Sequence, residues 1–229
     1  MHQLIKKIRL QNSFSEKISK FIKKIIVLKS RSYVSKWVYI MYTLFILTLL
    51  ITVSLFEKED IHLSLNKYHT PFLDFTFKYI TYLGDGIMFA ILIIYFFFIS
   101  KKESLKYAIS GVLTLIITTI TKRLIFIKSA RPVEYFGEEN LHLIKGVKMA
   151  HWHSFPSGHA ITVFIISALL ITSIKNKKQQ IFIVFCALLA GYSRVYLSQH
   201  FLIDIFAGSI IGVVLALLVN LIMNKINKK

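Results

Sequence analysis

The chain has 229 residues, of which 55% are hydrophobic and only 17% are charged, and its mean hydropathy is +0.61. This composition excludes an ordinary soluble domain and is typical of a protein with several transmembrane helices. The formal net charge is +18, and the single cysteine, Cys186, excludes an intramolecular disulfide.

Residues 1–36 form a strongly basic N-terminal arm. Lysines alternate there with isoleucines and other apolar residues, much of it at helical spacing, which predicts a basic amphipathic helix on the inner membrane surface. A disordered basic tail is the alternative. The arm has no short apolar core followed by small residues, so we do not expect a cleavable signal peptide. We expect two parts, this arm over residues 1–36 and one membrane domain over residues 37–229.

Six apolar segments follow the arm, and they predict an all-α, polytopic fold with six transmembrane helices. The segments comprise residues 37–56, 86–100, 105–121, 160–174, 181–197 and 203–223. Several are shorter than the roughly 20 residues that a full crossing needs. We therefore expect the helices to extend into the flanking polar residues.

The basic residues are distributed as a membrane topology requires. Of the 29 Lys and Arg residues, 19 lie in four regions, residues 1–36, 101–106, 175–178 and 225–229. Six crossings put all four regions on one side, and the positive-inside rule makes that side the cytoplasm. The charge thus reflects topology and attraction to anionic lipids, which argues against nucleic acid as a partner. We expect a bacterial inner-membrane protein with both termini in the cytoplasm.

Polar residues cluster in the segments that this topology places on the outer, periplasmic face. They include Arg131-Pro132, the run Pro156-Ser157-Gly158-His159, and Ser193-Arg194 followed by His200 and Asp204. Ionisable residues at membrane depth indicate a functional site. His200 and Asp204 are four residues apart and so share one face of a helix. Asp204 can then hold one imidazole nitrogen while the other attacks an electrophile.

The remaining residues of this set suit a tetrahedral phosphate. Arg131 and Arg194 have planar forks that match phosphate oxygens. Ser157 and Gly158 precede an apolar helix, where a hydroxyl and free backbone N–H groups can face an anion. His159 is then suited to protonating the leaving oxygen. These residues predict a ping-pong reaction through a phosphohistidine.

The spacing of these motifs resembles the type 2 phosphatidic acid phosphatase (PAP2) family, which shares its site with vanadium-dependent haloperoxidases. The family pattern is a lysine, six residues and Arg-Pro; then Pro-Ser-Gly-His; then Ser-Arg, five residues, His, three residues and Asp. The second and third parts are complete here, at residues 156–159 and 193–204. The first part departs, because six residues of spacing before Arg131 would place the lysine at Leu124.

Three basic residues compete for the place of this lysine. Lys122, Arg123 and Lys128 are separated from Arg131 by eight, seven and two residues. We expect Lys122, at the outer end of the third apolar segment, with a two-residue insertion in the loop that follows.

The resemblance implies a PAP2-like helical core and a role for each matching residue. His200 would be the nucleophile, His159 the general acid and Asp204 the group that orients His200. The residues that would bind phosphate are Lys122, Arg131, Ser157, Gly158 and Arg194. The family needs no metal and no other cofactor. His151 and His153 could suggest a metal site, but they have no clear third ligand, and we interpret their segment as a membrane-interface loop.

The predicted function is that of a metal-independent phosphatase acting on a phosphorylated lipid of the outer leaflet. The lengthened first motif and the 23-residue loop over residues 133–155 leave room for a bulky head group and favour lipid A. Undecaprenyl pyrophosphate and phosphatidylglycerol phosphate are the alternative substrates. A lipid phosphotransferase with the same phosphohistidine and a non-enzymatic lipid-binding or transport protein are rival functions. The complete set of His159, His200 and Asp204 disfavours the non-enzymatic rival.

Overall fold

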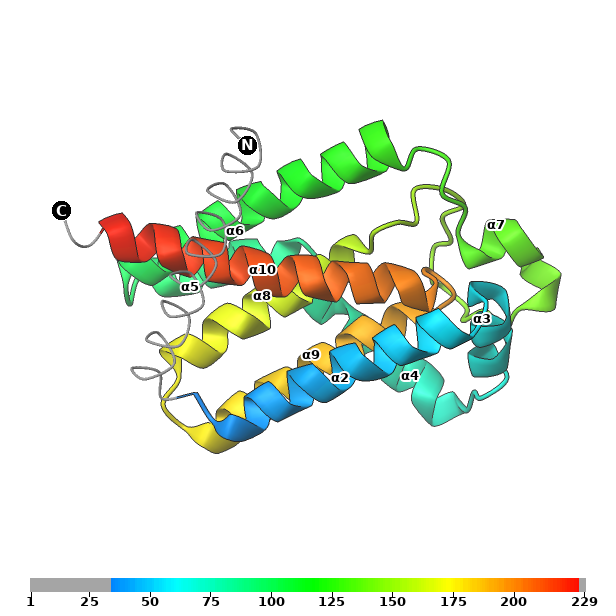
Figure 1. Ribbon diagram of the computed structural model, residues 1–229, viewed down its shortest axis with the longest axis horizontal. Helices are drawn as coiled ribbons and strands as arrows, with labels where there is room; N and C mark the ends of the chain where they lie inside the picture. Colours follow the sequence, from blue (N-terminus) through cyan, green and yellow to red (C-terminus); the bar gives the residue numbers. More distant parts are fainter. Residues whose placement is uncertain (1–33, 227–229) are drawn as a thin grey trace, which may run out of the picture. The chain divides into compact units, whose positions relative to one another are not determined.

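The computed structural model describes residues 34–226. The predicted amphipathic helix of the basic arm falls almost entirely outside this range, so it stays a prediction. Between residues 34 and 226 every regular element is helical, which confirms the all-α fold (Figure 1). The elements in chain order are α2 (Lys36–Leu55), α3 (Lys58–Asn66), α4 (Pro71–Ile80), η1 (Thr81–Gly84), α5 (Ile87–Phe97), α6 (Lys101–Ile120), η2 (Thr121–Ile125), α7 (Pro132–Phe136), η3 (Glu138–Asn140), α8 (Gly158–Ser173), α9 (Lys177–Tyr196) and α10 (Leu202–Ile226).

The six expected apolar segments correspond to α2, α5, α6, α8, α9 and α10. Three helices in the described range are long and apolar enough to cross a membrane, namely α2, α6 with its continuation η2, and α10. A fourth span is possible if α4 and η1 join α5 across their 59° bend. Helix α8 is short, at 16 residues, and α9 begins with two lysines. The chain is therefore a multi-pass membrane protein, and six crossings stay a prediction.

The segment between α2 and α5 contains helices that hydrophobic periodicity does not indicate. Helix α4 begins at Pro71, and Thr70 caps it by accepting a hydrogen bond from the Leu73 N–H at 3.2 Å. Helix α3 has the acidic residues Glu59 and Asp60 in its first turn. Proline at the first helical position, a threonine cap and acidic first-turn residues all favour helix starts. Residues 57–70 contain no long apolar segment, so hydrophobic patterning alone does not predict these helices.

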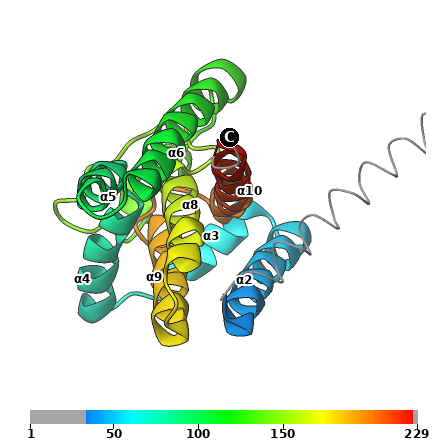
Figure 2. The ribbon, with the colours of Figure 1, turned by 90° about the vertical axis from the view of Figure 1, so that its left-hand side faces the viewer.

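Helix α8 lies at the centre of the packed helices. It contacts α6, α9 and α10, and Figure 2 shows it between them. Every residue from 160 to 167 is buried. A helix that is apolar on all sides is expected in such a position. The first turn of α8, with the predicted site residues Ser157, Gly158 and His159, is consequently held by neighbours on several sides.

Helix α10 packs against α8 at very short range through two glycines. A Cβ atom on Gly208 would lie 2.8 Å from both the Ala160 Cβ and the Ser157 carbonyl oxygen, and one on Gly212 would lie 2.7 Å from the Ile161 carbonyl oxygen. Small residues four positions apart allow helices in membranes to approach each other in this way. Asp204 lies one turn before Gly208, so the close contact places Asp204 beside the start of α8.

Two hydrogen bonds show which helix ends lie together. The Ser35 N–H at the start of α2 donates to Gln180 Oε1 in α9 at 2.8 Å, and Ser173 Oγ at the end of α8 donates to Glu103 Oε2 in α6 at 2.7 Å. The basic regions 101–106 and 175–178 therefore lie at this end. The predicted site residues lie at the opposite end of the helices, where α6 and α9 finish and α8 and α10 begin (Figure 1).

We predict that Gly212→Ala lowers the melting temperature of the purified protein in detergent. The new Cβ would collide with the backbone of α8, and overpacking of this kind costs about 1–3 kcal/mol. Gly86→Ala is the matched control, because a Cβ at Gly86 meets nothing within 4 Å. Equal melting temperatures for both variants would contradict the close contact of α8 and α10.

Candidate active site

The turn between α9 and α10 brings His200 back beside Arg194. The N–H groups of Gln199 and His200 both donate to the Arg194 carbonyl oxygen, at 2.9 and 3.1 Å. Ser198 has a φ of +51°, in the left-handed region. Six residues of continuous helix would put Arg194 and His200 on different faces, whereas this turn puts both side chains at one site, as the sequence predicts.

Helix α3 supports this turn through two side chains. Both His62 Nε2 and Asn66 Nδ2 lie 3.2 Å from Ser198 Oγ. Burial lowers the pKa of His62 to about 4, so the ring is neutral near pH 7. A neutral ring next to the turn adds no charge to those that surround His200.

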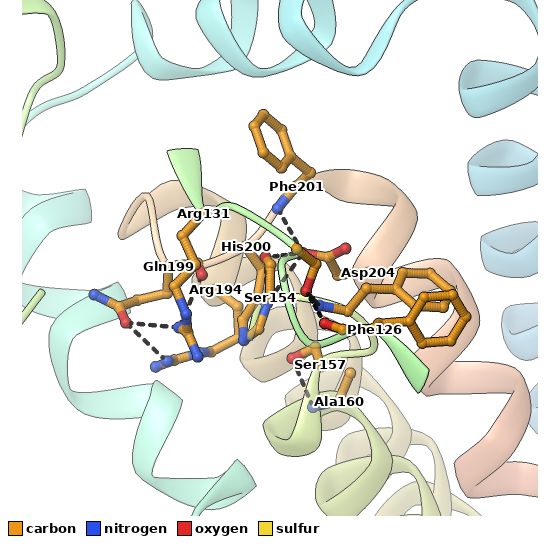
Figure 3. Close-up of polar contacts among 12 residues, drawn as sticks. Phe126, Arg131, Ser154, Ser157, Ala160, Arg194, Gln199, His200, Phe201 and Asp204 are labelled. Atoms are coloured by element: carbon orange, nitrogen blue, oxygen red, sulfur yellow. Dashed lines mark hydrogen bonds and ion pairs between the residues drawn. The ribbon is translucent and has the colours of Figure 1, made fainter. Parts of the chain in front are cut away.

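His200, Asp204 and Ser154 form a buried hydrogen-bonded set (Figure 3). Asp204 Oδ2 accepts from His200 Nδ1 at 3.1 Å, from Ser154 Oγ at 2.5 Å and from the Phe201 N–H at 3.1 Å. The first contact is the one that the four-residue spacing predicts. Because Nδ1 carries the proton in this pairing, Nε2 keeps its lone pair and is the atom able to attack.

The environment of His200 keeps its imidazole neutral. His200 is only 1% exposed. Burial lowers the pKa of His200 well below its usual range, and the charges of Arg131, Lys122 and Arg194 lower it further. A neutral ring is required of a nucleophile, since a protonated imidazole has no free lone pair.

Arg131 and Arg194 meet at one residue that sequence reasoning missed, Gln199 (Figure 3). Arg131 Nη1 donates to Gln199 Oε1 at 3.2 Å, and Arg194 Nη2 donates to the same oxygen at 3.4 Å. Arg194 also donates to Thr81 Oγ1 at 2.8 Å, and its buried Nε–H finds no acceptor among residues 34–226. The two predicted phosphate-binding arginines therefore lie together. The Nε–H of Arg194 is the donor that could bind a ligand without breaking an existing hydrogen bond.

Lys122 lies in a π-helical turn, η2, at the end of α6. The Phe126 N–H donates to the Thr121 carbonyl oxygen at 2.7 Å, a bond that spans five residues. Lys122 is partly buried and interacts electrostatically with Arg131, Arg194 and Asp204. A π turn holds one residue more than an α turn, and such turns are frequent at functional sites. Part of the extra length in the first motif is therefore taken up directly beside the lysine.

Arg123 and Lys128, the two competitors of Lys122, have exposed side chains. Lys122, Arg131 and Arg194 all contribute to the electrostatic environment of both His159 and His200. The geometry thus favours Lys122 as the motif lysine.

His159 in the first turn of α8 faces Asp85, which follows η1. Its Nε2 lies 4.0 Å from Asp85 Oδ2, and the His159 side chain is 31% exposed. Gly84 makes this approach possible, because a Cβ there would lie 2.8 Å from the His159 carbonyl oxygen. Asp85 also accepts a hydrogen bond from the Ile87 N–H at the start of α5. It thereby brings a negative charge to the edge of the site.

Ser157 and Gly158 begin α8 as the sequence predicts. Ser157 is the N-cap, and its Oγ accepts from the Ala160 N–H at 3.3 Å. The Ser157 N–H donates to the Asp204 carbonyl oxygen at 3.1 Å, which joins the starts of α8 and α10. The first N–H groups of a helix have no partner within it and form an anion-binding position.

His151 and His153 bind different partners. His151 Nδ1 lies 2.8 Å from Glu134 Oε2, whereas His153 Nδ1 donates to the Lys122 carbonyl oxygen at 2.9 Å. Between them, the Trp152 side chain is exposed, and its carbonyl oxygen accepts from Arg131 Nε at 3.0 Å. The segment thus supports Arg131 through its side chain and Lys122 through its backbone.

Comparison with known proteins gives the family. The model of the PAP2 superfamily matches residues 103–228, more than half of the chain. The chain belongs to the PAP2 superfamily. No curated protein matches the sequence significantly.

Two solved structures from the superfamily share the fold. The crystal structure of LpxE from Aquifex aeolicus is 28% identical, covers 70% of this chain and 93% of its own, and has a TM-score of 0.59. The crystal structure of the first transmembrane PAP2-type phosphatidylglycerolphosphate phosphatase from Bacillus subtilis is 24% identical. The match covers 82% of this chain and 95% of the Bacillus subtilis chain, with a TM-score of 0.60. At 24% identity, the similarity to the Bacillus subtilis protein shows a shared fold and nothing more. The chain therefore has the fold of the membrane PAP2 phosphatases.

We predict that His200→Ala retains less than about a tenth of the wild-type phosphatase turnover while the protein still purifies folded. Ser154→Ala should lower turnover by about tenfold, because Asp204 loses one of its buried donors. Ser209→Ala is the matched control, since its hydroxyl bonds only the Phe206 carbonyl oxygen within α10. Turnover of His200→Ala above that level would exclude His200 as the nucleophile.

We predict that Lys122→Ala lowers turnover by roughly a hundredfold or more, because a charged donor that acts on the transition state is removed. Arg123→Ala and Lys128→Ala should each stay within about tenfold of wild type. Steady-state phosphate release by the three purified variants makes this comparison. A severe loss in Lys128→Ala with a mild one in Lys122→Ala would place the insertion on the wrong side of the lysine.

Proposed function

We propose that the protein removes phosphate from a phosphorylated membrane lipid through a phosphohistidine on His200. The observation that carries this proposal is the convergence of three cations, Lys122, Arg131 and Arg194, on two imidazoles at one end of the helices. Buried charges of one sign are unfavourable unless a counter-charge joins them. The neighbouring carboxylate of Asp204 is already bonded to His200, so a dianionic phosphate ester completes the site.

The geometry supports a two-step reaction. His200 Nε2 attacks phosphorus, and the bond from phosphorus to the lipid oxygen breaks as that oxygen takes a proton from His159. The three cations and the first turn of α8 stabilise the charge on the transferring group. Water then attacks the phosphohistidine and gives its proton to His159, which releases inorganic phosphate and restores both rings.

The site lies at the end of the helices opposite the basic regions 101–106 and 175–178. By the positive-inside rule this end faces outward, which in a bacterial inner membrane is the periplasm. The substrate is then a lipid of the outer leaflet. The same proposal places both termini in the cytoplasm. It also divides the chain into a basic arm over residues 1–36 and a membrane domain over residues 37–229.

Lipid A is the substrate that we favour among three candidates. The loop 133–155 contains most of α7 and all of η3, and it is joined to the site through Gln199, whose Nε2 donates to the Lys148 carbonyl oxygen at 3.2 Å. A long loop over the phosphate site gives a bulky head group a surface to contact. Phosphatidylglycerol phosphate, the substrate class in the name of the Bacillus subtilis protein, and undecaprenyl pyrophosphate are the alternatives. A phosphotransferase that passes the phosphate to a lipid acceptor is the rival reaction.

The purified enzyme should release inorganic phosphate from at least one of these three lipids, presented separately in mixed micelles. Mass spectrometry of the lipid products distinguishes hydrolysis, which yields the dephosphorylated lipid, from transfer, which yields a newly phosphorylated lipid. His200→Ala run in parallel provides the inactive control. Phosphate release by that variant equal to wild type would contradict the proposal.

Orthovanadate should inhibit competitively, because it adopts the trigonal-bipyramidal geometry of the transition state and such analogues bind more tightly than substrate. EDTA should leave activity unchanged, since every proposed contact to phosphate is made by the chain itself. Loss of activity on chelation, restored by a divalent cation, would show that a metal takes part.

A further inference from the structure

Gln199 makes a different contact with each end of its side-chain amide. It is 4% exposed and immediately precedes His200. Its Oε1 accepts from Arg131 and Arg194, and its Nε2 donates to the Lys148 carbonyl oxygen at 3.2 Å and contacts Met149 Sδ at 3.0 Å. With donors facing the oxygen and acceptors facing the nitrogen, the network defines the orientation of the amide.

The backbone of Gln199 contributes as well. Its carbonyl oxygen accepts from Arg131 Nη1 at 3.0 Å, so one nitrogen of Arg131 contacts the residue twice. Arg131 is held further by the Trp152 carbonyl oxygen. The position of the Arg131 guanidinium is therefore defined by neutral acceptors.

Two guanidinium groups that share one site repel each other. Arg131 and Arg194 interact as like charges, and Arg194 is buried while Arg131 is partly buried. The side-chain oxygen Oε1 of Gln199 accepts from both groups and carries a partial negative charge, which offsets the repulsion. Because the amide is neutral, it offsets the repulsion without cancelling the charge that binds an anion.

We propose that Gln199 is a positioning residue that sets the spacing of Arg131 and Arg194 before phosphate arrives and couples them to the outer loop at Lys148. The inference rests on the proposed function, since it assigns the two arginines to phosphate binding. Preorganised donors avoid reorganisation when the ligand binds. Gln199 thus acts on the affinity for a phosphate-like anion through the arginines.

The test is the affinity of the intact, purified protein for orthovanadate, measured by isothermal titration in detergent. Gln199→Met keeps the approximate size and the neutrality of the side chain but removes Oε1, the oxygen that accepts from both arginines. We expect its dissociation constant for orthovanadate to rise by about tenfold, and the KM for the lipid to rise with it. The melting temperature serves as the measure of any purely structural effect.

Gln180, in the first turn of α9, offers a matched control. It is also a buried glutamine, and its Nε2 donates to the carbonyl oxygens of Ile171 and Ile174, at the end remote from the site. Gln180→Met should lower the melting temperature but leave the dissociation constant for orthovanadate unchanged. If Gln199 had only a structural role, Gln199→Met would also lower the melting temperature and leave the dissociation constant for orthovanadate unchanged.

Gln199→Glu tests the importance of neutrality and covers the case in which the methionine variant fails to fold. The glutamate keeps an acceptor oxygen between the arginines, but its charge pairs with them and competes with the ligand. We expect orthovanadate to bind this variant more weakly than it binds Gln199→Met, by a further factor of about ten.

Two results would overturn the inference, and they are distinguishable. If the wild type releases phosphate and binds orthovanadate, and both Gln199 variants bind it equally well, Gln199 does not position the arginines and the proposed function stands. If the wild type neither releases phosphate from any of the three lipids nor binds orthovanadate, the proposed function fails, and this inference fails with it.

Discussion

The buried carboxylate of Asp204 is the group on which the arrangement of the site depends. A carboxylate that is 2% exposed is costly unless donors surround it. Two of its donors, the His200 ring and the Phe201 N–H, come from the α9–α10 turn, and the third, the Ser154 hydroxyl, comes from the loop before α8. Meeting the hydrogen-bonding need of one group therefore fixes the α9–α10 turn, the loop before α8 and the start of α10 relative to one another.

The close packing of α8 and α10 makes this arrangement possible. Gly208 and Gly212 let the two backbones approach, and the Ser157 N–H then reaches the Asp204 carbonyl oxygen. The first turn of α8 is thereby set beside His200, with its partial positive charge directed at the same place as the cations. The packing of α10 against α8 therefore also determines the electrostatics of the site. A shift along α10 would move Asp204 away from His200 and would break its contact with α8.

Sequence reasoning succeeds where a contact is local and fails where it is long-range. The His200–Asp204 bond follows from a spacing of four, and the N-cap at Ser157 follows from its place before an apolar run. The roles of Ser154 and Gln199 could not be read in this way, because serine and glutamine are common surface residues and their contacts here join distant segments. Helices α3 and α4 were missed for another reason, since their start signals lie outside any long apolar segment.

The first motif shows why linear spacing alone does not locate a residue. Each added residue turns a regular α-helix by about 100° and would redirect the side chains that follow. With Lys122 as the proposed motif lysine, the π turn over Thr121–Ile125 would take up one of the two added residues without ending the helix, and the segment before Arg131 would take up the other. Lys122 is partly buried and interacts electrostatically with both arginines, whereas Arg123, the next residue, is exposed. An insertion near a binding site is thus compatible with an unchanged site when a local irregularity of the helix takes up the added residue.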